Sequence, residues 1–212
     1  MYKRQDDDRI EGISIEHTFL QSGMSQTQVI RDALTDFKKS GKFIYAYHDY
    51  FRQKDYYLAS VADSVFVHPE GGVELSGLAS EVLYLKEFQD ITGIKMQVIR
   101  SGAYKSAVEP FLQNEMSEEN REQIKSLLDS FWAEMVVKIE ERTALTPKKI
   151  NEIASSLDAL ISANAVQLGV VDDAILRNEY SELLRAKMEL EEDDKLHTIC
   201  LLYTSDAADD QA

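Results

Sequence analysis

The sequence has 212 residues, enough for one domain of ordinary size with its own hydrophobic core. Apolar residues make up 44% of it and the mean hydropathy is -0.32, which are values of a globular chain rather than a disordered one. The net charge of -15 argues against non-specific binding of nucleic acid and against attraction to anionic lipid headgroups.

No apolar run approaches the length that crosses a bilayer, and no apolar stretch follows the basic residues at the start, as a signal peptide would require. We therefore expect this piece to be soluble, and a membrane anchor upstream of it stays open.

The first half of the chain alternates predicted strands with predicted helices. Residues 10–16 alternate apolar and polar side chains, which is a strand pattern. Ser25 and Gln28 have the spacing of a capping box, and they predict a helix that stops near Gly41. Residues 43–47 form a short continuous apolar run, as expected of a parallel strand covered on both faces.

The same rhythm continues to about residue 100. The patterns predict a second helix and a strand, then a turn with a brief strand, a third helix and a last strand, at residues 56–62, 65–67, 69–75, 78–90 and 95–99. Strands and helices in alternation favour an α/β layer architecture.

After residue 100 the pattern becomes helical. Ser117 can cap a long helix whose apolar residues from Ile124 to Ile139 form a wide stripe, and this stripe must pack against something. Residues 146–147, a Thr-Pro pair, open another helix. Residues 159–168 predict one more, and residues 170–176 a terminal strand or docking turn.

The ends of the chain are predicted to lie outside the fold. We expect residues 1–9 to be a disordered start, 10–190 one domain and 191–199 an acidic linker. Residues 200–212 resemble the read-through translation of a sequencing adaptor, so we exclude them from fold reasoning and expect the natural protein to continue beyond residue 199. The single cysteine, Cys200, lies in that tail and supports no redox or metal argument.

Common catalytic and binding motifs do not account for this sequence. The histidines lack metal-ligand spacing with cysteines or carboxylates, and we expect each to lie on the surface or at a strand end: His17, His48, His68 and His197. A phosphate loop and a Gly-x-Ser-x-Gly elbow are both missing from the sequence. No cofactor is implied.

One segment, residues 100–111, has an unusual composition. It follows a predicted strand, has a glycine that permits a tight bend, and presents Lys105 between an aromatic and a small residue. Pro110 prevents a helix from continuing through it until Ser117. By composition alone Lys105 would be an ordinary solvated lysine, because lysines are almost never buried unpaired.

The block Gly102-Ala-Tyr-Lys-Ser-Ala-Val-Glu-Pro-Phe111 is very similar to a segment of the signal peptide peptidase A (protease IV) family in its long, two-domain form. Weaker matches follow in the same order, so that the resemblance covers roughly residues 10–190: Ser40–Tyr47, Asp55–Asp63, Pro69–Gly77, Met116–Arg121 and Ala165–Asp172.

This resemblance implies a crotonase/Clp-protease-like layered α/β fold with a helical C-terminal part. It also implies that the N-terminal domain supplies a general-base lysine, which corresponds to Lys105, and that the C-terminal domain supplies the serine nucleophile. In this chain Gln53 stands where the serine would be, with Lys54 and Asp55 in place of a glycine pair. A glutamine amide cannot accept an acyl group, so the chain resembles the N-terminal half.

A Ser–Lys pair works only when the amine is neutral, so that it can accept the hydroxyl proton. We expect the pKa of Lys105 to be near its ordinary value in this piece and to fall only when a second domain buries the amine. Glu109 would raise that pKa if it lay close by. We expect it to point away, either capping the helix that begins at Ser117 or pairing with a basic residue.

The function that the resemblance implies is degradation of cleaved signal peptides by a Ser–Lys serine endopeptidase, of which this piece alone lacks the nucleophile. The implied partners are the C-terminal domain, further copies in a homo-oligomer and, through a missing anchor, the bacterial cytoplasmic (inner) membrane, with the catalytic part on the outer, periplasmic side.

Two alternatives stay open on the same fold. A crotonase-type acyl-CoA enzyme would stabilise an enolate with backbone amides and would not use Lys105. A non-catalytic scaffold or assembly domain would carry Lys105 only as an inherited residue.

Overall fold

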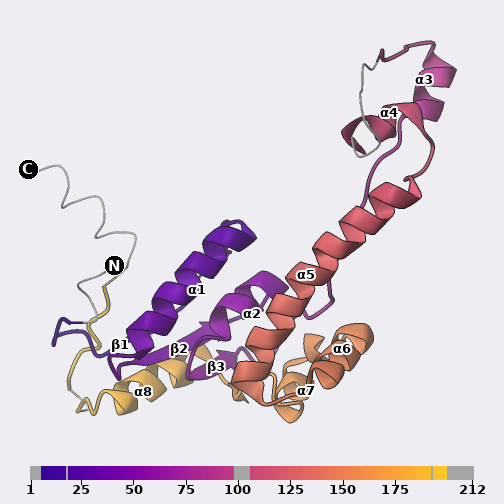
Figure 1. The fold of residues 1–212 in the computed structure, drawn as a ribbon. Coiled ribbons are helices and arrows are strands. Elements are labelled where there is room, and N and C mark those ends of the chain that lie inside the picture. The colour runs from indigo at the N-terminus through magenta and orange to yellow at the C-terminus, as the bar shows by residue number, and fades with distance from the viewer. Residues whose placement is uncertain (1–5, 18, 98–105, 192, 200–212) are drawn as a thin grey trace, which may run out of the picture.

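A computed structural model describes residues 6–17, 19–97, 106–191 and 193–199, and it contains one parallel sheet (Figure 1). Its four strands lie in the order of the chain: β1 (Gly12–Ile15), β2 (Phe43–His48), β3 (Ser64–Val67) and β4 (Asp173–Ala174). In the register of the two inner strands, Ala46 lies opposite Val65 and Tyr47 opposite Phe66.

Helices lie on both faces of this sheet (Figure 1): α1 (Met24–Lys38) and α2 (Gln53–Ala59) on one side, and α8 (Arg177–Lys187) on the other. Ile44 and Ala46 of β2 are fully buried among the side chains of α1 and α2. Tyr47 points to the opposite face, where its ring stacks on Tyr180 of α8 at a centroid distance of 4.9 Å. The predicted layered α/β fold, with a parallel strand covered on both faces, is confirmed.

The helical part lies beside the sheet, and its elements are α5 (Glu118–Thr143), α6 (Pro147–Ser156), η2 (Asp158–Leu160) and α7 (Ser162–Gln167). As predicted, Ser117 caps α5, because its hydroxyl accepts a hydrogen bond from the backbone N–H of Asn120. Thr146 caps α6 in the same way, with Pro147 as the first helical residue. The helix predicted over 159–168 is divided in two, because Ile161 is extended.

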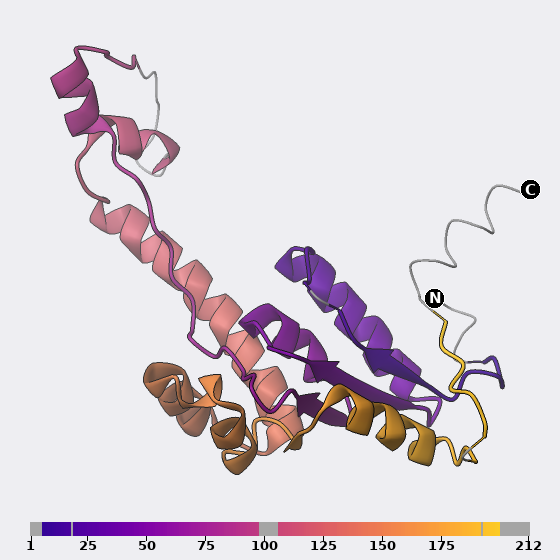
Figure 2. The ribbon, with the colours of Figure 1, turned by 180° about the vertical axis from the view of Figure 1, so that it is seen from behind.

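At the end of α5 remote from the sheet, three short elements form an arm (Figure 1): α3 (Lys86–Thr92), η1 (Ser106–Val108) and α4 (Glu109–Leu112). We use the name "arm" for residues 78–97 and 106–131. Its first residues, 78–85, have no regular secondary structure and run alongside α5 (Figure 2).

A helix predicted to start at residue 78 is therefore wrong over residues 78–85. Val82 in this segment lines an open groove together with Ile124 and Leu127 of α5, and the tertiary surroundings of a segment can override its local helix propensity. The strand predicted over 95–99 is wrong for residues 95–97, which have no regular structure, and its last two residues lie outside the described part of the chain.

Other predicted elements differ from the observed ones by a few residues, and an observed helix was not predicted. The N-cap of α1 is Gly23 instead of Ser25, and the side chain of Gln26 accepts the Gly23 N–H at 3.0 Å. Helix α2 begins at Gln53, three residues earlier than predicted, and the brief strand after the turn is reduced to one bridge between Val73 and Phe51. Helix α8 was not predicted.

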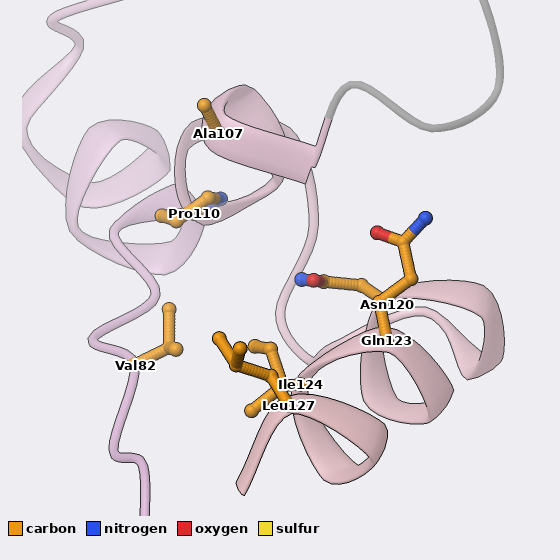
Figure 3. A pocket seen from close by; sticks show the side chains of 7 residues that line it. All are labelled: Val82, Ala107, Pro110, Asn120, Gln123, Ile124 and Leu127. Atoms are coloured by element: carbon orange, nitrogen blue, oxygen red, sulfur yellow. The ribbon is translucent and has the colours of Figure 1, made fainter. Parts of the chain in front are cut away.

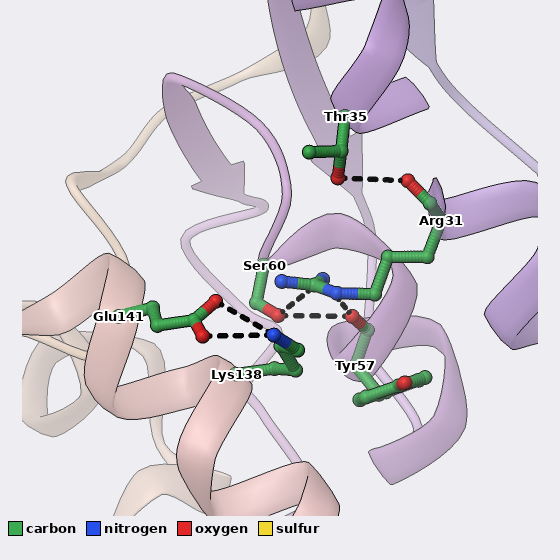
Figure 4. Close-up of polar contacts among 6 residues, drawn as sticks. All are labelled: Arg31, Thr35, Tyr57, Ser60, Lys138 and Glu141. Atoms are coloured by element: carbon green, nitrogen blue, oxygen red, sulfur yellow. Dashed lines mark hydrogen bonds and ion pairs between the residues drawn. The ribbon is translucent and has the colours of Figure 1, made fainter. Parts of the chain in front are cut away.

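The C-terminal end of α2 is held by a buried arginine from α1 (Figure 4). The Arg31 guanidinium donates hydrogen bonds to the carbonyl oxygen of Tyr57 at 2.7 Å and to the Ser60 hydroxyl at 2.8 Å. The last carbonyl groups of a helix have no partner within the helix, so a cation donating to one of them stabilises that end. Arg31 thereby fixes α2, the helix that begins with Gln53.

Candidate functional site in and below the arm

Lys105, the predicted catalytic residue, lies outside the described residues, as do the other residues of 98–105. The part of the block that the structure describes begins at Ser106. Side chains of the arm hold the chain at residues on both sides of this segment in the sequence.

Glu109, four residues after Lys105, is a buried carboxylate at the first position of α4, with only 3% of its surface exposed. Its oxygens accept hydrogen bonds from the Ser117 hydroxyl at 2.5 Å, the Ser117 backbone N–H at 3.3 Å and the Asn120 side-chain amide at 3.0 Å. Of the two roles foreseen for Glu109, the one at the cap of the Ser117 helix is therefore confirmed. The carboxylate joins α4 to the start of α5.

Gln89 of α3 is a second buried polar anchor, which the sequence analysis missed. Its amide nitrogen donates to the carbonyl oxygen of Phe111 at 2.9 Å, and its amide oxygen accepts the backbone N–H of Met96 at 2.8 Å. Residues 96 and 111 lie on either side of the Lys105 segment in the sequence. The chain is thus fastened to the interior of the arm both before and after Lys105.

Tyr84 adds a third polar group to the interior of the arm. Its hydroxyl oxygen is buried and has no hydrogen-bond partner among the described residues. Burial, and then the negative charge of Glu109, raise the pKa of this phenol. The hydroxyl is therefore protonated at neutral pH and available as a donor.

An open, mainly apolar groove of about 360 Å³ lies between α4 and α5 (Figure 3). Its lining side chains come from residues 78–85, from η1 and α4, and from α5: Val82, Ala107, Pro110, Asn120, Gln123, Ile124 and Leu127. The outside of the arm is also apolar, since Leu83 is 76% exposed and Ile91 86%. Several large apolar side chains of the arm are exposed in this way, as is typical of a contact surface: Leu83, Phe88, Ile91, Ile94 and Met96.

Gln53, where the resemblance would place a serine in the other half, lies at the base of the arm as the first residue of α2. Its side-chain oxygen accepts the backbone N–H groups of Ser76 and Gly77, both at 2.9 Å, and its amide nitrogen donates to the Gly77 carbonyl oxygen at 2.8 Å. An amide so engaged offers no nucleophile.

Three titratable side chains lie close together at the first turn of α2: Asp55, His17 and His48. The Asp55 carboxylate accepts a hydrogen bond from His17 at 3.1 Å and one from the Leu20 backbone N–H at 3.3 Å. Burial acts to raise the pKa of Asp55, but the hydrogen bond and the charge of His17 outweigh it, so that this pKa lies below its ordinary value. The ring of His48 packs edge-on to that of His17, with centroids 4.3 Å apart.

His48 occupies the end of β2, as expected, but it is buried rather than solvated. Its Nε2 atom is buried and has no hydrogen-bond partner among the described residues. Burial, with a smaller contribution from the charge of His17, lowers the pKa of His48 from 6.5 to about 4, although Asp55 and Asp49 act in the opposite direction.

Stability should therefore depend on pH through His48. A histidine with a lowered pKa binds more protons in the unfolded state, so unfolding becomes easier as the pH falls from 6.5 towards 4. The shift corresponds to a loss of about 3 kcal/mol in the free energy of unfolding. Urea unfolding at a series of pH values measures this loss, and His48→Leu should remove most of it. An equal slope in the variant would show that other groups are responsible.

The described ranges contain neither a metal-binding cluster nor a membrane-spanning helix. No group of three or more histidine, cysteine or carboxylate side chains is arranged there to hold a metal ion. No described helix combines the length and apolar character needed to cross a bilayer.

Comparison with known proteins agrees with the sequence resemblance. The sequence profile of the family described as peptidase family S49 matches residues 36–191. The chain is 32% identical over 203 residues to Protease 4 of Haemophilus influenzae, covering 92% of this chain and 33% of that protein. Over 147 residues it is 33% identical to Protease 4 of Salmonella typhi, covering 69% of this chain and 24% of that protein.

More distant matches extend the comparison. The chain is 29% identical over 195 residues to the chloroplastic serine protease SPPA of Arabidopsis thaliana, covering 91% of this chain and 28% of that protein. A solved peptidase structure from Plasmodium falciparum covers 80% of this chain, and 82% of that structure is matched, at 10% identity and a TM-score of 0.41, a weak overall likeness.

The chain spans about a third of the length of the first of these relatives, or less of the others. A family profile that matches most of the chain nevertheless defines its relationship. Membership agrees with the crotonase/Clp-protease-like fold that the resemblance implied. The chain belongs to peptidase family S49.

Proposed function

We propose that this chain is the lysine-bearing half of a Ser–Lys serine endopeptidase that degrades cleaved signal peptides. Membership of family S49 and the likeness to serine proteases support peptidase activity. The observation that carries the proposal is the arm: two buried side chains, Gln89 and Glu109, fasten the chain on either side of Lys105, beside an open apolar groove.

In the proposed reaction the Lys105 amine acts as general base. It takes the proton of a serine hydroxyl while the serine oxygen attacks the peptide carbonyl carbon. The resulting ammonium then returns the proton to the leaving amine, which produces an acyl-enzyme and a free peptide end. A water molecule hydrolyses the acyl-enzyme by the same route.

This chemistry requires a neutral lysine. With an ordinary pKa of about 10.4, only about one lysine in 2,500 is neutral at pH 7. A pKa lower by about three units requires about 4 kcal/mol of differential destabilisation of the ammonium. Burial beneath a second domain provides a shift of this size. The exposed apolar side chains of the arm are a suitable contact surface for such a domain.

The partner that we propose is the C-terminal domain of the same protein, which supplies the serine. Further copies of the protein would form a homo-oligomer, with the upper part of α5 contributing to the contacts, since Leu127 and Phe131 of the predicted stripe are exposed while Met135 and Ile139 are buried. We place the full protein at the bacterial cytoplasmic membrane, held by an anchor outside this sequence, with its catalytic part on the outer side.

The test compares this chain with the full-length protein on an internally quenched, extended apolar peptide. We expect cleavage by the full-length protein and none above background by this chain, because Gln53 cannot act as nucleophile. Cleavage by this chain alone would contradict the division of the dyad. Hydrolysis of acyl-CoA thioesters by a full-length protein that leaves the peptide intact would support the acyl-CoA enzyme instead.

A further inference from the structure

Gln53 makes three hydrogen bonds to two consecutive residues, Ser76 and Gly77, which lie 23 and 24 positions further along the chain. Only one orientation of the amide satisfies all three, because a flipped amide would set its N–H₂ against two backbone N–H donors. The side chain therefore holds both backbone N–H groups and the carbonyl oxygen of Gly77 at once.

Few residue types could replace this amide. A serine hydroxyl ends one atom beyond Cβ and is too short to reach the same three groups. A glutamate could accept the two N–H groups but would place a carboxylate oxygen against the Gly77 carbonyl oxygen. The pattern of two acceptor contacts and one donor contact selects glutamine at this position.

The backbone that Gln53 holds, at Ser76 and Gly77, lies immediately before the arm. Before this point the chain is tied to the segment between β2 and α2, since the Phe51 N–H donates to the Gly72 carbonyl at 2.9 Å and the Glu74 N–H to the Phe51 carbonyl at 2.8 Å. At Gly77 the backbone turns with a φ of 77°, a conformation that favours glycine. Residues 78–85 then run along α5 to the arm (Figure 2).

Helix α2, which carries Gln53, is itself held in place at both of its ends. Arg31 caps its C-terminal end, and the cluster of Asp55 with His17 fastens its first turn (Figure 4 shows the Arg31 contacts). The direction in which the chain enters the arm is thus set against a helix that is itself held at both ends.

We infer that Gln53 is a positioning residue, which sets the direction of the arm relative to the sheet and thereby the place of Lys105. The effect on Lys105 rests on the proposed function, whereas the effect on the direction of the arm does not. At the position where the resemblance places the nucleophile of the other half, this half carries the side chain that orients the arm bearing the base.

The experiment uses Gln53→Met, which keeps the length of the side chain and removes all three hydrogen bonds. Gln28→Met is the matched control, because Gln28 is an exposed glutamine near the start of α1. Amide hydrogen exchange at Ser76 and Gly77 should accelerate at least about tenfold in Gln53→Met and stay unchanged in the control. Unchanged exchange would overturn the inference.

Arm direction is measured with two spin labels, at Glu87→Cys on α3 and Ala186→Cys on α8, in a Cys200→Ser background. Both positions are exposed. We expect the distribution of distances between the labels to broaden or shift in Gln53→Met, and an unchanged distribution would also overturn the inference. Gln53→Ala provides the same test should the Met variant not fold.

In the full-length protein Gln53→Met should lower kcat by about tenfold to a hundredfold, because small misplacements of a catalytic group are costly. KM should change little. Faster amide exchange at Ser76 and Gly77 in Gln53→Met, together with an unchanged kcat, would contradict the link to Lys105. A full-length wild-type protein that cleaves no peptide would remove the proposed function, while exchange and label distances would still decide the role of Gln53.

Discussion

Replacing Lys105 by Ala in the full-length protein is expected to lower kcat/KM for peptide cleavage by at least about a thousandfold. A general base contributes on this scale, and no other group could take the proton from the serine at neutral pH in the proposed reaction. Lys105→Arg should be as inactive as Lys105→Ala, because a guanidinium keeps the positive charge but cannot be deprotonated in a protein.

The matched control for this pair of variants is Lys95→Ala, since Lys95 is an exposed lysine of the same arm. Its activity should equal that of the wild type. Cleavage by Lys105→Ala at the wild-type rate would favour a non-catalytic scaffold. Substantial activity of Lys105→Arg would show that the residue acts through its charge rather than as a base.

Glu109→Ala is expected to destabilise the arm by about 3 kcal/mol. The substitution leaves the partly buried Ser117 hydroxyl and the buried Asn120 amide without their acceptor, and loss of a buried charged partner costs this much. Hydrogen exchange of amides in α4 and in the first turn of α5 should accelerate by about a hundredfold as a result.

Two variants calibrate the effect of Glu109. Glu115→Ala, at an exposed position of the same arm, should change exchange little. Glu109→Gln keeps one acceptor oxygen and should lie between the two. Equal exchange in Glu109→Ala and Glu115→Ala would mean that the buried carboxylate does not hold α4 to α5.

Local signals predicted a large part of this fold. The caps of α5 and α6 were found from Ser117 and from the Thr146-Pro147 pair, because capping depends on residues within one turn of the chain. The strands β2 and β3 were found from short apolar runs, which are expected of a parallel strand covered on both faces. The role of Glu109 at the cap of α5 was foreseen as one of two possibilities.

Features that depend on distant contacts could not be predicted. Segment 78–85 has a composition that suits a helix, and its place alongside α5, with Val82 at the groove, is a tertiary feature that the local sequence does not show. Gln53 and Gln89 resemble ordinary surface residues in the sequence, since their partners lie 23 and 22 residues away at Ser76 and Phe111. Helix α8 is a different case, because Tyr180 and Leu184 stand at helical spacing in the sequence and no distant contact accounts for its absence from the prediction.

The most direct test of the account is the pKa of the Lys105 amine, measured by NMR on this chain and on the full-length protein with the serine of its C-terminal half replaced by alanine. We expect a value near the ordinary 10.4 in this chain and about three units lower in the assembled protein. A pKa near 7 in this chain would contradict the claim that a partner surface is needed, and an ordinary pKa in the assembled protein would contradict the role of Lys105 as the base.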